Sequence, residues 1–273
     1  MSIFAEMELY KWSGAGNTFV VIDGRAGVTD IEIIRLCREF KTDGLMILKE
    51  SPAGRDFAME FYNPDGSGGM MCGNGGRCIV AFADFLGIGN GKTYEFDAPD
   101  GVHAAEILKK PGETKEWTVR LQMRDVDGVT EFPDGLFLNT GTRHFVKFVP
   151  DVEAIDIEKE ALPIRHDSRF APEGTNVNFV ALRQAQGPDI AIRTFEKGVE
   201  DETAACGTGI TAAAIACRYR CVAPASSSAE GKNVRILYKL QAREAVLSVD
   251  FVQKAKESFT DIHLTGPAEL LDK

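Results

Sequence analysis

Two cysteines in this 273-residue chain begin the same short glycine-rich sequence, once in each half. Cys72 and Cys206 are each followed by Gly-x-Gly and then by an apolar stretch, and the offset between them is 206 − 72 = 134 residues. The other positions that match at this offset are Phe61 and Phe195, Gly73 and Gly207, and Gly75 and Gly209. An offset close to half of the chain length predicts a protein built from two similar halves.

A cysteine in this position is suited to proton transfer. If the apolar stretch that follows is a helix, the thiol lies near its N-terminus, where the helix dipole and the free N–H groups stabilise a thiolate. The same N–H groups bind a carboxylate. If both halves face one substrate, one thiolate removes a proton from a carbon and the other thiol returns a proton on the opposite face. We therefore interpret Cys72 and Cys206 as the acid and base of an enzyme that inverts a carbon centre, for which no pyridoxal phosphate is needed.

The two cysteines could instead be structural residues or metal ligands. Free cysteines are often small buried apolar residues, and that role would suit either cysteine alone. The repetition of the whole motif in both halves favours a catalytic role over a structural one. A metal site is not indicated, because Cys72 and Cys78 are separated by five residues, Cys217 and Cys221 by three, and no His lies near either pair.

The apolar pattern predicts the elements that would hold these motifs. Apolar runs at 79–86 and 208–218 follow the glycine turns and predict buried helices, and residues 30–40 predict a third helix. Strands are predicted at 8–22, 45–48, 57–62, 93–96, 102–108, 117–123, 136–138, 144–149, 177–182, 190–195, 234–238 and 245–252. Because strands outnumber helices and are not separated by regular helices, we expect an α+β fold rich in antiparallel strands rather than a doubly wound parallel sheet.

Two polar loops interrupt this pattern. The loop at 111–116 lies close to mid-chain, so we expect one half at 1–114 and the other at 115–265, with 266–273 returning to the first half. The second loop, at 223–232, is expected to be a surface excursion of the second half.

Composition argues against several classes of partner. With 31 Lys and Arg against 41 Asp and Glu, the formal charge is −10, which disfavours binding to nucleic acid or to an anionic membrane surface. No stretch approaches the ~20 apolar residues of a membrane span. The N-terminal residues do not have the pattern of a secretory signal, so we expect a cytoplasmic protein with reduced cysteines. The expected partner is a small molecule, and the sequence leaves open whether the protein is a homodimer.

Five segments of the chain resemble the diaminopimelate epimerase family. They are residues 14–23 (GAGNTFVVID), 63–78 (NPDGSGGMMCGNGGRC), 173–180 (EGTNVNFV), 195–209 (FEKGVEDETAACGTG) and 264–268 (LTGPA). The resemblance implies two pseudo-symmetric domains, each a mostly antiparallel or mixed sheet wrapped around a central helix, with the active site in the cleft between them. It also implies an epimerase without cofactor or metal, whose acid–base pair matches Cys72 and Cys206.

Further site residues follow from the resemblance. Glu196 and His144 match the other catalytic residues of the family. The substrate-binding positions that match are Asn17, Asn63, Asn176, the pair Gly73 and Asn74, and the pair Gly207 and Thr208. The backbone of the two pairs would hold the reacting carboxylate, whereas Asn63 and Asn176 would hold the end of the substrate that does not react. Taken without the resemblance, Asn17 and Asn63 would be read as turn residues.

The chain departs from the family pattern at three places, of which those at 142–143 and 197 concern the distal end of the substrate. Thr142 and Arg143 replace Asn-Pro, Lys197 replaces Arg, and Thr18 replaces Asp. A lysine keeps the charge of an arginine but not its bidentate grip on a carboxylate, so either Arg143 and Lys197 bind the distal carboxylate together or the substrate is another amino acid.

We therefore predict an isomerase that interconverts LL- and meso-diaminopimelate for lysine and peptidoglycan synthesis. The alternatives are a racemase of the same fold acting on another amino acid and, less favoured, a non-catalytic amino-acid-binding protein.

Overall fold

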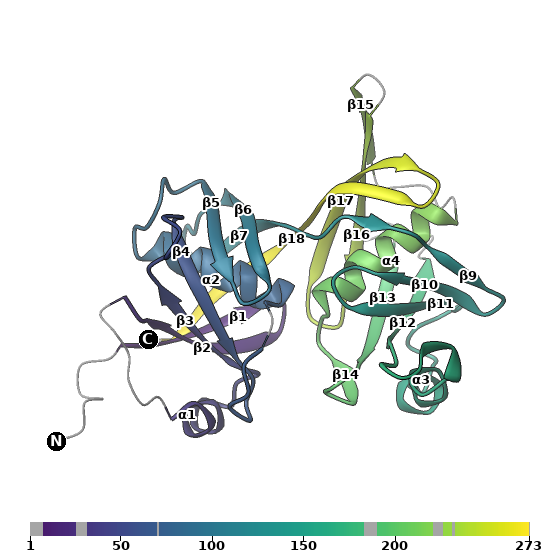
Figure 1. The fold of residues 1–273 in the computed structure, drawn as a ribbon, viewed down its shortest axis with the longest axis horizontal. Coiled ribbons are helices and arrows are strands. Elements are labelled where there is room, and N and C mark those ends of the chain that lie inside the picture. Colours follow the sequence, from purple (N-terminus) through teal and green to yellow (C-terminus); the bar gives the residue numbers. More distant parts are fainter. Residues whose placement is uncertain are drawn as a thin grey trace. The chain divides into compact units, whose positions relative to one another are not determined.

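The computed structural model describes residues 8–25, 32–69, 71–182, 190–220, 226–230 and 233–272 (Figure 1). The chain divides into two compact units. Unit 1 contains Met1–Leu121 and Gly266–Lys273, and unit 2 contains Gln122–Thr265. Each helix within the described residues is too short or too polar to cross a membrane.

Unit 1 is a ring of strands around one helix. In chain order its elements are β1 (Leu9–Gly14), β2 (Asn17–Asp23), α1 (Ile33–Phe40), β3 (Leu45–Lys49), β4 (Phe57–Tyr62), α2 (Gly73–Phe85), β5 (Thr93–Ala98), β6 (Gly101–Lys109), β7 (Glu116–Gln122) and the last part of β18 (Ser258–Asp272). Each strand from β1 to β7 pairs with the next, and β18 pairs with both β7 and β1 to close the ring.

Unit 2 has a similar arrangement around its own helix. Its elements are β8 (Val126–Asp127), β9 (Thr130–Phe132), β10 (Gly135–Asn139), β11 (Arg143–Phe148), α3 (Ile157–Arg165), a 3₁₀ turn (Ser168–Phe170), β12 (Asn176–Leu182), β13 (Ile190–Glu196), β14 (Asp201–Thr203), α4 (Gly207–Tyr219), β15 (Ser226–Glu230), β16 (Asn233–Gln241), β17 (Val246–Ala255) and the first part of β18. The main strands pair in the order β9, β10, β11, β12, β13, β16, β17, β18, β8.

The two units repeat one topology. The order β1-β2-α1-β3-β4-α2-β5-β6 in unit 1 matches β10-β11-α3-β12-β13-α4-β16-β17 in unit 2. In both units the strand after the first helix is parallel to the strand before it. The strands that flank the second helix in this order are also parallel, β4 with β5 in unit 1 and β13 with β16 in unit 2, where the short β14 and β15 are added next to α4. The repeat predicted from the 134-residue offset is therefore present in the structure, and the α+β fold is confirmed.

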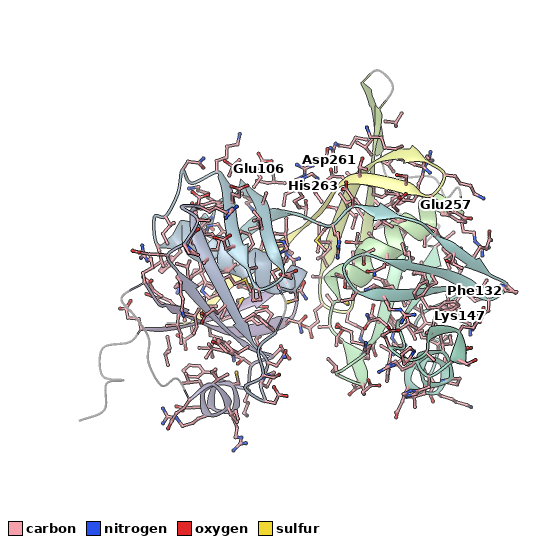
Figure 2. All side chains as sticks on the ribbon, in the orientation of Figure 1. Glu106, Phe132, Lys147, Glu257, Asp261 and His263 are labelled. Carbon is pink, nitrogen blue, oxygen red and sulfur yellow. The ribbon has the colours of Figure 1, made fainter. Side chains whose placement is uncertain are left out.

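Burial explains why the two helices of each unit differ in sequence. All but two residues of α2 are buried, as are most residues of α4, so the residues of these central helices are mostly apolar around the whole helix. Figure 1 shows the strands that surround each of them. The outer helices α1 and α3 bury only one face. α1 covers Val20, Ile22, Leu45 and Ile47. On the α3 side of unit 2, where Figure 2 labels Phe132 and Lys147, the ring of Phe132 meets that of Phe170 edge to face, and Lys147 donates to Glu160 of α3.

Some expected boundaries were wrong. The glycine turn that precedes residue 79 is not a loop but the first turn of α2, which begins at Gly73, since a helix can contain glycine where close packing requires it. Helix α4 begins at Gly207, within one residue of its expected start. Helix α3 was not expected at all. Residues 226–230, expected in a loop, form β15 and pair with β16, while 223–225 and 231–232 lie outside the described residues. The loop expected at the domain boundary joins β6 to β7 within unit 1.

Candidate active site

Cys72 is the N-cap residue of α2. Its backbone is extended, with φ −105° and ψ 153°, and its Sγ accepts a hydrogen bond from the backbone N–H of Gly75 at 3.2 Å. A Cβ atom on Gly75 would lie 3.1 Å from Met46 Sδ and 3.3 Å from Cys72 Sγ, so this glycine allows the close approach. The prediction that this thiol lies at a helix N-terminus, above N–H groups that have no acceptor within the helix, is confirmed.

A buried cation lies behind this helix end. Arg77 is fully buried, and its guanidinium donates to Gly73 O at 3.0 Å, Asn74 Oδ1 at 2.8 Å and Pro267 O at 3.2 Å. Burial lowers its pKa to about 10, so the side chain is still charged at neutral pH. Asn74 in turn donates through Nδ2 to Asn17 Oδ1 at 2.6 Å. Arg77 thus fixes Asn74 and Asn17 beside Cys72.

Asn63 occupies a tight turn directly after β4. Its backbone N–H donates to Ser67 O at 2.9 Å, its Nδ2 donates to Ser67 Oγ at 3.0 Å, and its carbonyl accepts from Gly66 N at 2.9 Å. The turn chemistry expected of Asn63 is therefore present. A role in substrate binding stays a prediction.

Cys206 occupies the corresponding position in unit 2, as the N-cap residue of α4. Its backbone is extended, with φ −103° and ψ 110°, but its side chain makes no capping bond to the helix backbone. Its Sγ instead lies 3.4 Å from the hydroxyl oxygen of Thr208. The two thiols thus share a place in the fold and differ in their hydrogen-bond partner.

His144 lies behind Thr208 and is fully buried. Its Nε2 is 2.9 Å from the hydroxyl oxygens of both Thr208 and Thr142, and its Nδ1 is 3.0 Å from Nδ2 of Asn178. Burial lowers the pKa of His144 to about 3, so the ring is neutral at physiological pH. Asn178 also accepts a hydrogen bond from the hydroxyl of Thr194 at 3.0 Å.

Three other thiols, those of Cys37, Cys78 and Cys217, are buried. Burial raises the pKa of Cys37 and of Cys78, and raises that of Cys217 to about 12. These thiols are therefore poor acids and bases at neutral pH. Cys221 lies outside the described residues. Within the described residues, His, Cys, Asp and Glu side chains form no group of three that could bind a metal ion.

Asn176 connects the segments that carry the two cations expected at the distal end of the substrate. Its Nδ2 donates to Arg143 O at 2.9 Å, and its Oδ1 accepts from Lys197 N at 2.8 Å. The side chain of Arg143 pairs with Glu173 and lies over the ring of Phe137, 5.3 Å from its centroid. Lys197 is exposed. Arg143 is therefore already engaged by a carboxylate of its own unit.

Glu196 ends β13 and accepts a hydrogen bond from the hydroxyl of Thr203 in β14. That strand leads directly into Cys206. Together these contacts join seven of the expected residues within unit 2: His144, Thr208, Cys206 and Gly207 at the helix end, and Asn176, Arg143 and Lys197 beside them. Four expected residues of unit 1 gather around the start of α2: Cys72, Gly73, Asn74 and Asn17.

Sequence reasoning missed three residues of these clusters: Arg77, Asn178 and Thr194. Each is a buried polar residue in a helix or strand whose buried residues are mostly apolar, and Asn178 and Thr194 are paired across β12 and β13. A polar residue at a position that the apolar pattern assigns to the core is the signal that could have identified all three.

Comparison with known proteins places this chain in a family. The family model described as diaminopimelate epimerase matches residues 9–123 and 136–246. A diaminopimelate epimerase of Flavobacterium psychrophilum is 40% identical over 97% of this chain and 98% of its own. The diaminopimelate epimerase of Chlorobaculum tepidum is 38% identical over 94% and 96% of the two chains.

Solved structures share the fold at low sequence identity. A PhzF-family phenazine biosynthesis protein of Bacillus anthracis has a TM-score of 0.72 and 13% identity, covering 97% of this chain and 96% of its own. A probable proline racemase of Agrobacterium radiobacter has a TM-score of 0.65 and 15% identity, covering 97% and 91%. From the family match and the extent of the sequence identity, this chain belongs to the diaminopimelate epimerase family.

Proposed function

We propose that this protein interconverts LL- and meso-diaminopimelate with two thiols and no cofactor. One observation carries the proposal: each unit has a cysteine as the N-cap residue of its buried central helix, at the same step of a repeated topology. Membership of the epimerase family supplies the substrate. The alternative of a non-catalytic binding protein does not account for the presence of this cysteine in both halves.

In the proposed reaction, the thiolate of Cys72 or Cys206 removes the proton from the α-carbon. The electron pair left on the carbon moves into the adjacent carboxylate, which becomes an enediolate. Backbone N–H groups of Gly73, Asn74, Gly207 and Thr208 stabilise its oxygens, as helix N-termini stabilise anions. The other thiol then gives its proton to the opposite face of the carbon. The configuration is inverted, and the enzyme ends with the proton on the thiol that began as the base.

The distal end of the substrate would be held by amides and a cation. Asn63 and Asn176 offer amide groups, and Lys197 offers an exposed ammonium to the distal carboxylate. Asn17 is a further substrate contact. Arg143 contributes to binding only if its pair with Glu173 opens, so we assign it the smaller share. His144 contacts Thr208 at the start of α4, and Glu196 binds Thr203 in the strand that leads to Cys206; both would set the protonation of that thiol.

This chemistry requires two free thiols, and we therefore propose that the enzyme works in the reducing cytoplasm. Whether it acts as a monomer or a homodimer can be decided by analytical ultracentrifugation.

The proposal is tested by incubating the protein with LL-diaminopimelate in deuterated water. The wild-type protein should form the meso isomer and introduce deuterium at the α-carbon, and Cys72→Ala and Cys206→Ala should each abolish inversion. Cys78→Ala is the matched control, since its thiol is buried in the same helix. Full inversion by either active-site variant contradicts the two-thiol mechanism. A wild-type protein that labels another amino acid but not diaminopimelate supports the racemase alternative.

A further inference from the structure

A continuous chain of buried polar side chains crosses unit 2 and ends at Cys206. It runs from Thr194 on β13 through Asn178 on β12 and His144 on β11 to Thr208 on α4. Thr194, Asn178 and His144 are at most 3% exposed. Buried polar groups are costly unless they are hydrogen-bonded, and each of these three side chains is. The chain is thus a built feature of the core and not an accidental contact.

The orientation of the Asn178 amide follows from its partners. Its Nδ2 lies 3.1 Å from Phe145 O, which is a backbone carbonyl and can only accept. Its Oδ1 lies 3.0 Å from the hydroxyl of Thr194, which donates to it. The amide NH₂ therefore also faces Nδ1 of His144 and donates to it. Consequently, Nδ1 of His144 is an acceptor and carries no proton.

The neutral ring then has its proton on Nε2. That N–H points at the hydroxyl oxygens of Thr142 and Thr208, each 2.9 Å away, and these two oxygens lie 3.0 Å from each other. Burial keeps the imidazole neutral, so it acts here as a hydrogen-bond donor and not as an acceptor for the proton of a thiol.

The remaining proton in this cluster is that of the Thr208 hydroxyl. Its oxygen accepts from the His144 Nε2–H, and it lies 3.0 Å from the Thr142 hydroxyl oxygen and 3.4 Å from Cys206 Sγ, so its own proton can point at the thiolate while Thr142 donates to it. We propose that Thr208 is the hydrogen-bond donor that stabilises the Cys206 thiolate, and that His144, Asn178 and Thr194 are positioning residues that act on the thiol through it. This inference rests on the proposed role of Cys206 and assigns His144 a different task from that of a base.

No covalent O–H or N–H bond of these side chains breaks during the cycle. When Cys206 takes the substrate proton, its S–H donates to Thr208 Oγ1, the Thr208 hydroxyl rotates to donate to Thr142 Oγ1, and the exposed Thr142 hydroxyl turns its own proton to solvent. When Cys206 returns the proton, both hydroxyls rotate back. His144 keeps its proton throughout. Thr142, which replaces the family's Asn, is the second acceptor that makes this rotation possible.

The test measures the thiolate of Cys206 without needing turnover. Alkylation of the full-length protein by iodoacetamide is followed by peptide mass spectrometry between pH 5 and pH 9.5, so that Cys206 and Cys72 are read separately. Thr208→Val should slow alkylation of Cys206 about tenfold at pH 7 and move the midpoint of its rate–pH curve upward, since a hydrogen bond to a charged group is lost. Thr208→Ser should behave as the wild type.

Two controls make the result specific. Thr211→Val makes the same chemical change in the same helix. The Thr211 hydroxyl donates to Gly207 O and takes no part in the row of hydrogen bonds that leads to Cys206, so the alkylation rate of Cys206 should be unaffected. Cys72 accepts from the backbone of Gly75, so its curve should not move in any Thr208 variant. Asn178→Ala frees the imidazole of His144 to change tautomer. It should lower the alkylation rate of Cys206 by a smaller factor than Thr208→Val does.

An unchanged Cys206 curve in Thr208→Val, or in Thr208→Ala if the valine variant does not fold, overturns the proposal. Equal slowing of Cys206 by Thr211→Val also overturns it. If Thr208→Val lowers the alkylation rate of Cys206 while the wild-type protein fails to invert diaminopimelate, the role proposed for Thr208 is correct and the proposed function is wrong.

Discussion

Single residues in this protein owe their ionisation states to burial. His144 and Arg77 are both fully buried, yet burial makes the first neutral and leaves the second charged. The reason is that the ordinary pKa of histidine lies close to neutrality whereas that of arginine lies far above it, so a downward shift has opposite consequences at pH 7. The result is a neutral donor behind Cys206 and a cation behind Cys72.

The lowered pKa of His144 predicts acid sensitivity. Its folded pKa of about 3 lies below the ordinary value of 6.5, so between these values the unfolded state binds more protons than the folded state. The free energy of unfolding should therefore fall as the pH falls from 6.5 towards 3, by about 1.4 kcal/mol per pH unit from this group. Above pH 6.5 the group should have no such effect.

Urea titrations of the wild type and His144→Gln at pH 7 and pH 4.5 measure this contribution. The wild type should lose about 2–3 kcal/mol more than the variant over this interval. Equal losses in the two proteins would show that His144 is protonated in the folded state at pH 4.5.

At the scale of elements, the second glycine of each C-G-x-G motif sets how closely a central helix approaches its sheet. A Cβ atom on Gly209 of α4 would lie 2.4 Å from Asn178 Oδ1 and 3.3 Å from His144 Cε1. At the matching Gly75 of α2 the nearest atom is the flexible Met46 Sδ at 3.1 Å. The requirement for glycine is therefore stricter at position 209, where the neighbour is a buried and hydrogen-bonded amide.

Gly209→Ala should destabilise the protein although alanine favours helix. The intrinsic gain is about 0.5–1 kcal/mol, whereas overpacking a core costs about 1–3 kcal/mol. We expect a net loss measurable by thermal unfolding, together with slower alkylation of Cys206 because Asn178 is displaced. Gly112→Ala, where no atom lies within 4 Å of the added Cβ, is the control and should be close to neutral. A Gly209→Ala variant as stable as Gly112→Ala would contradict the close packing of α4 on β12.

At the scale of the whole molecule, β18 belongs to both units. Its first part pairs with β17 and β8 in unit 2, and its last part pairs with β7 and β1 in unit 1. The last part also supplies Pro267 O, which accepts from the buried guanidinium of Arg77. Unit 1 therefore depends on residues that are separated from the rest of it by all of unit 2.

Ending the chain after Thr265 should unfold unit 1 and spare unit 2. The truncation removes one strand of the ring and one of the three acceptors of Arg77, but it leaves the β17 and β8 pairings of β18 in place. Hydrogen exchange read by mass spectrometry should show loss of protection in β1 to β7 and retained protection in α4 and β11 to β13. A chain that ends after Leu270, which keeps most of the paired residues, is the control. Protection lost equally in both units would show that they unfold together.

Local sequence accounts for much of the fold. Most strands and the helices α1, α2 and α4 were predicted near their observed places, because their apolar periodicity and glycine positions are local signals. Helix α3 was missed because Pro163 lies inside it and charged residues interrupt its apolar face, although Asp156 caps it by accepting from Lys159 N at 3.3 Å. The repeat itself offered a second signal, since α3 holds the place in unit 2 that α1 holds in unit 1.

The amino-acid sequence by itself determined the chemistry-bearing residues: two cysteines, each followed by a glycine-containing apolar helix, and the repeat that relates them. It did so because N-caps, close packing and periodicity depend on neighbours in the chain. Only the tertiary structure decided what surrounds those cysteines. The pairing of Arg143 with Glu173, the burial of Arg77, the hydrogen-bond chain to Thr208 and the sharing of β18 all join residues distant in sequence, and burial and partner orientation are properties of the folded chain.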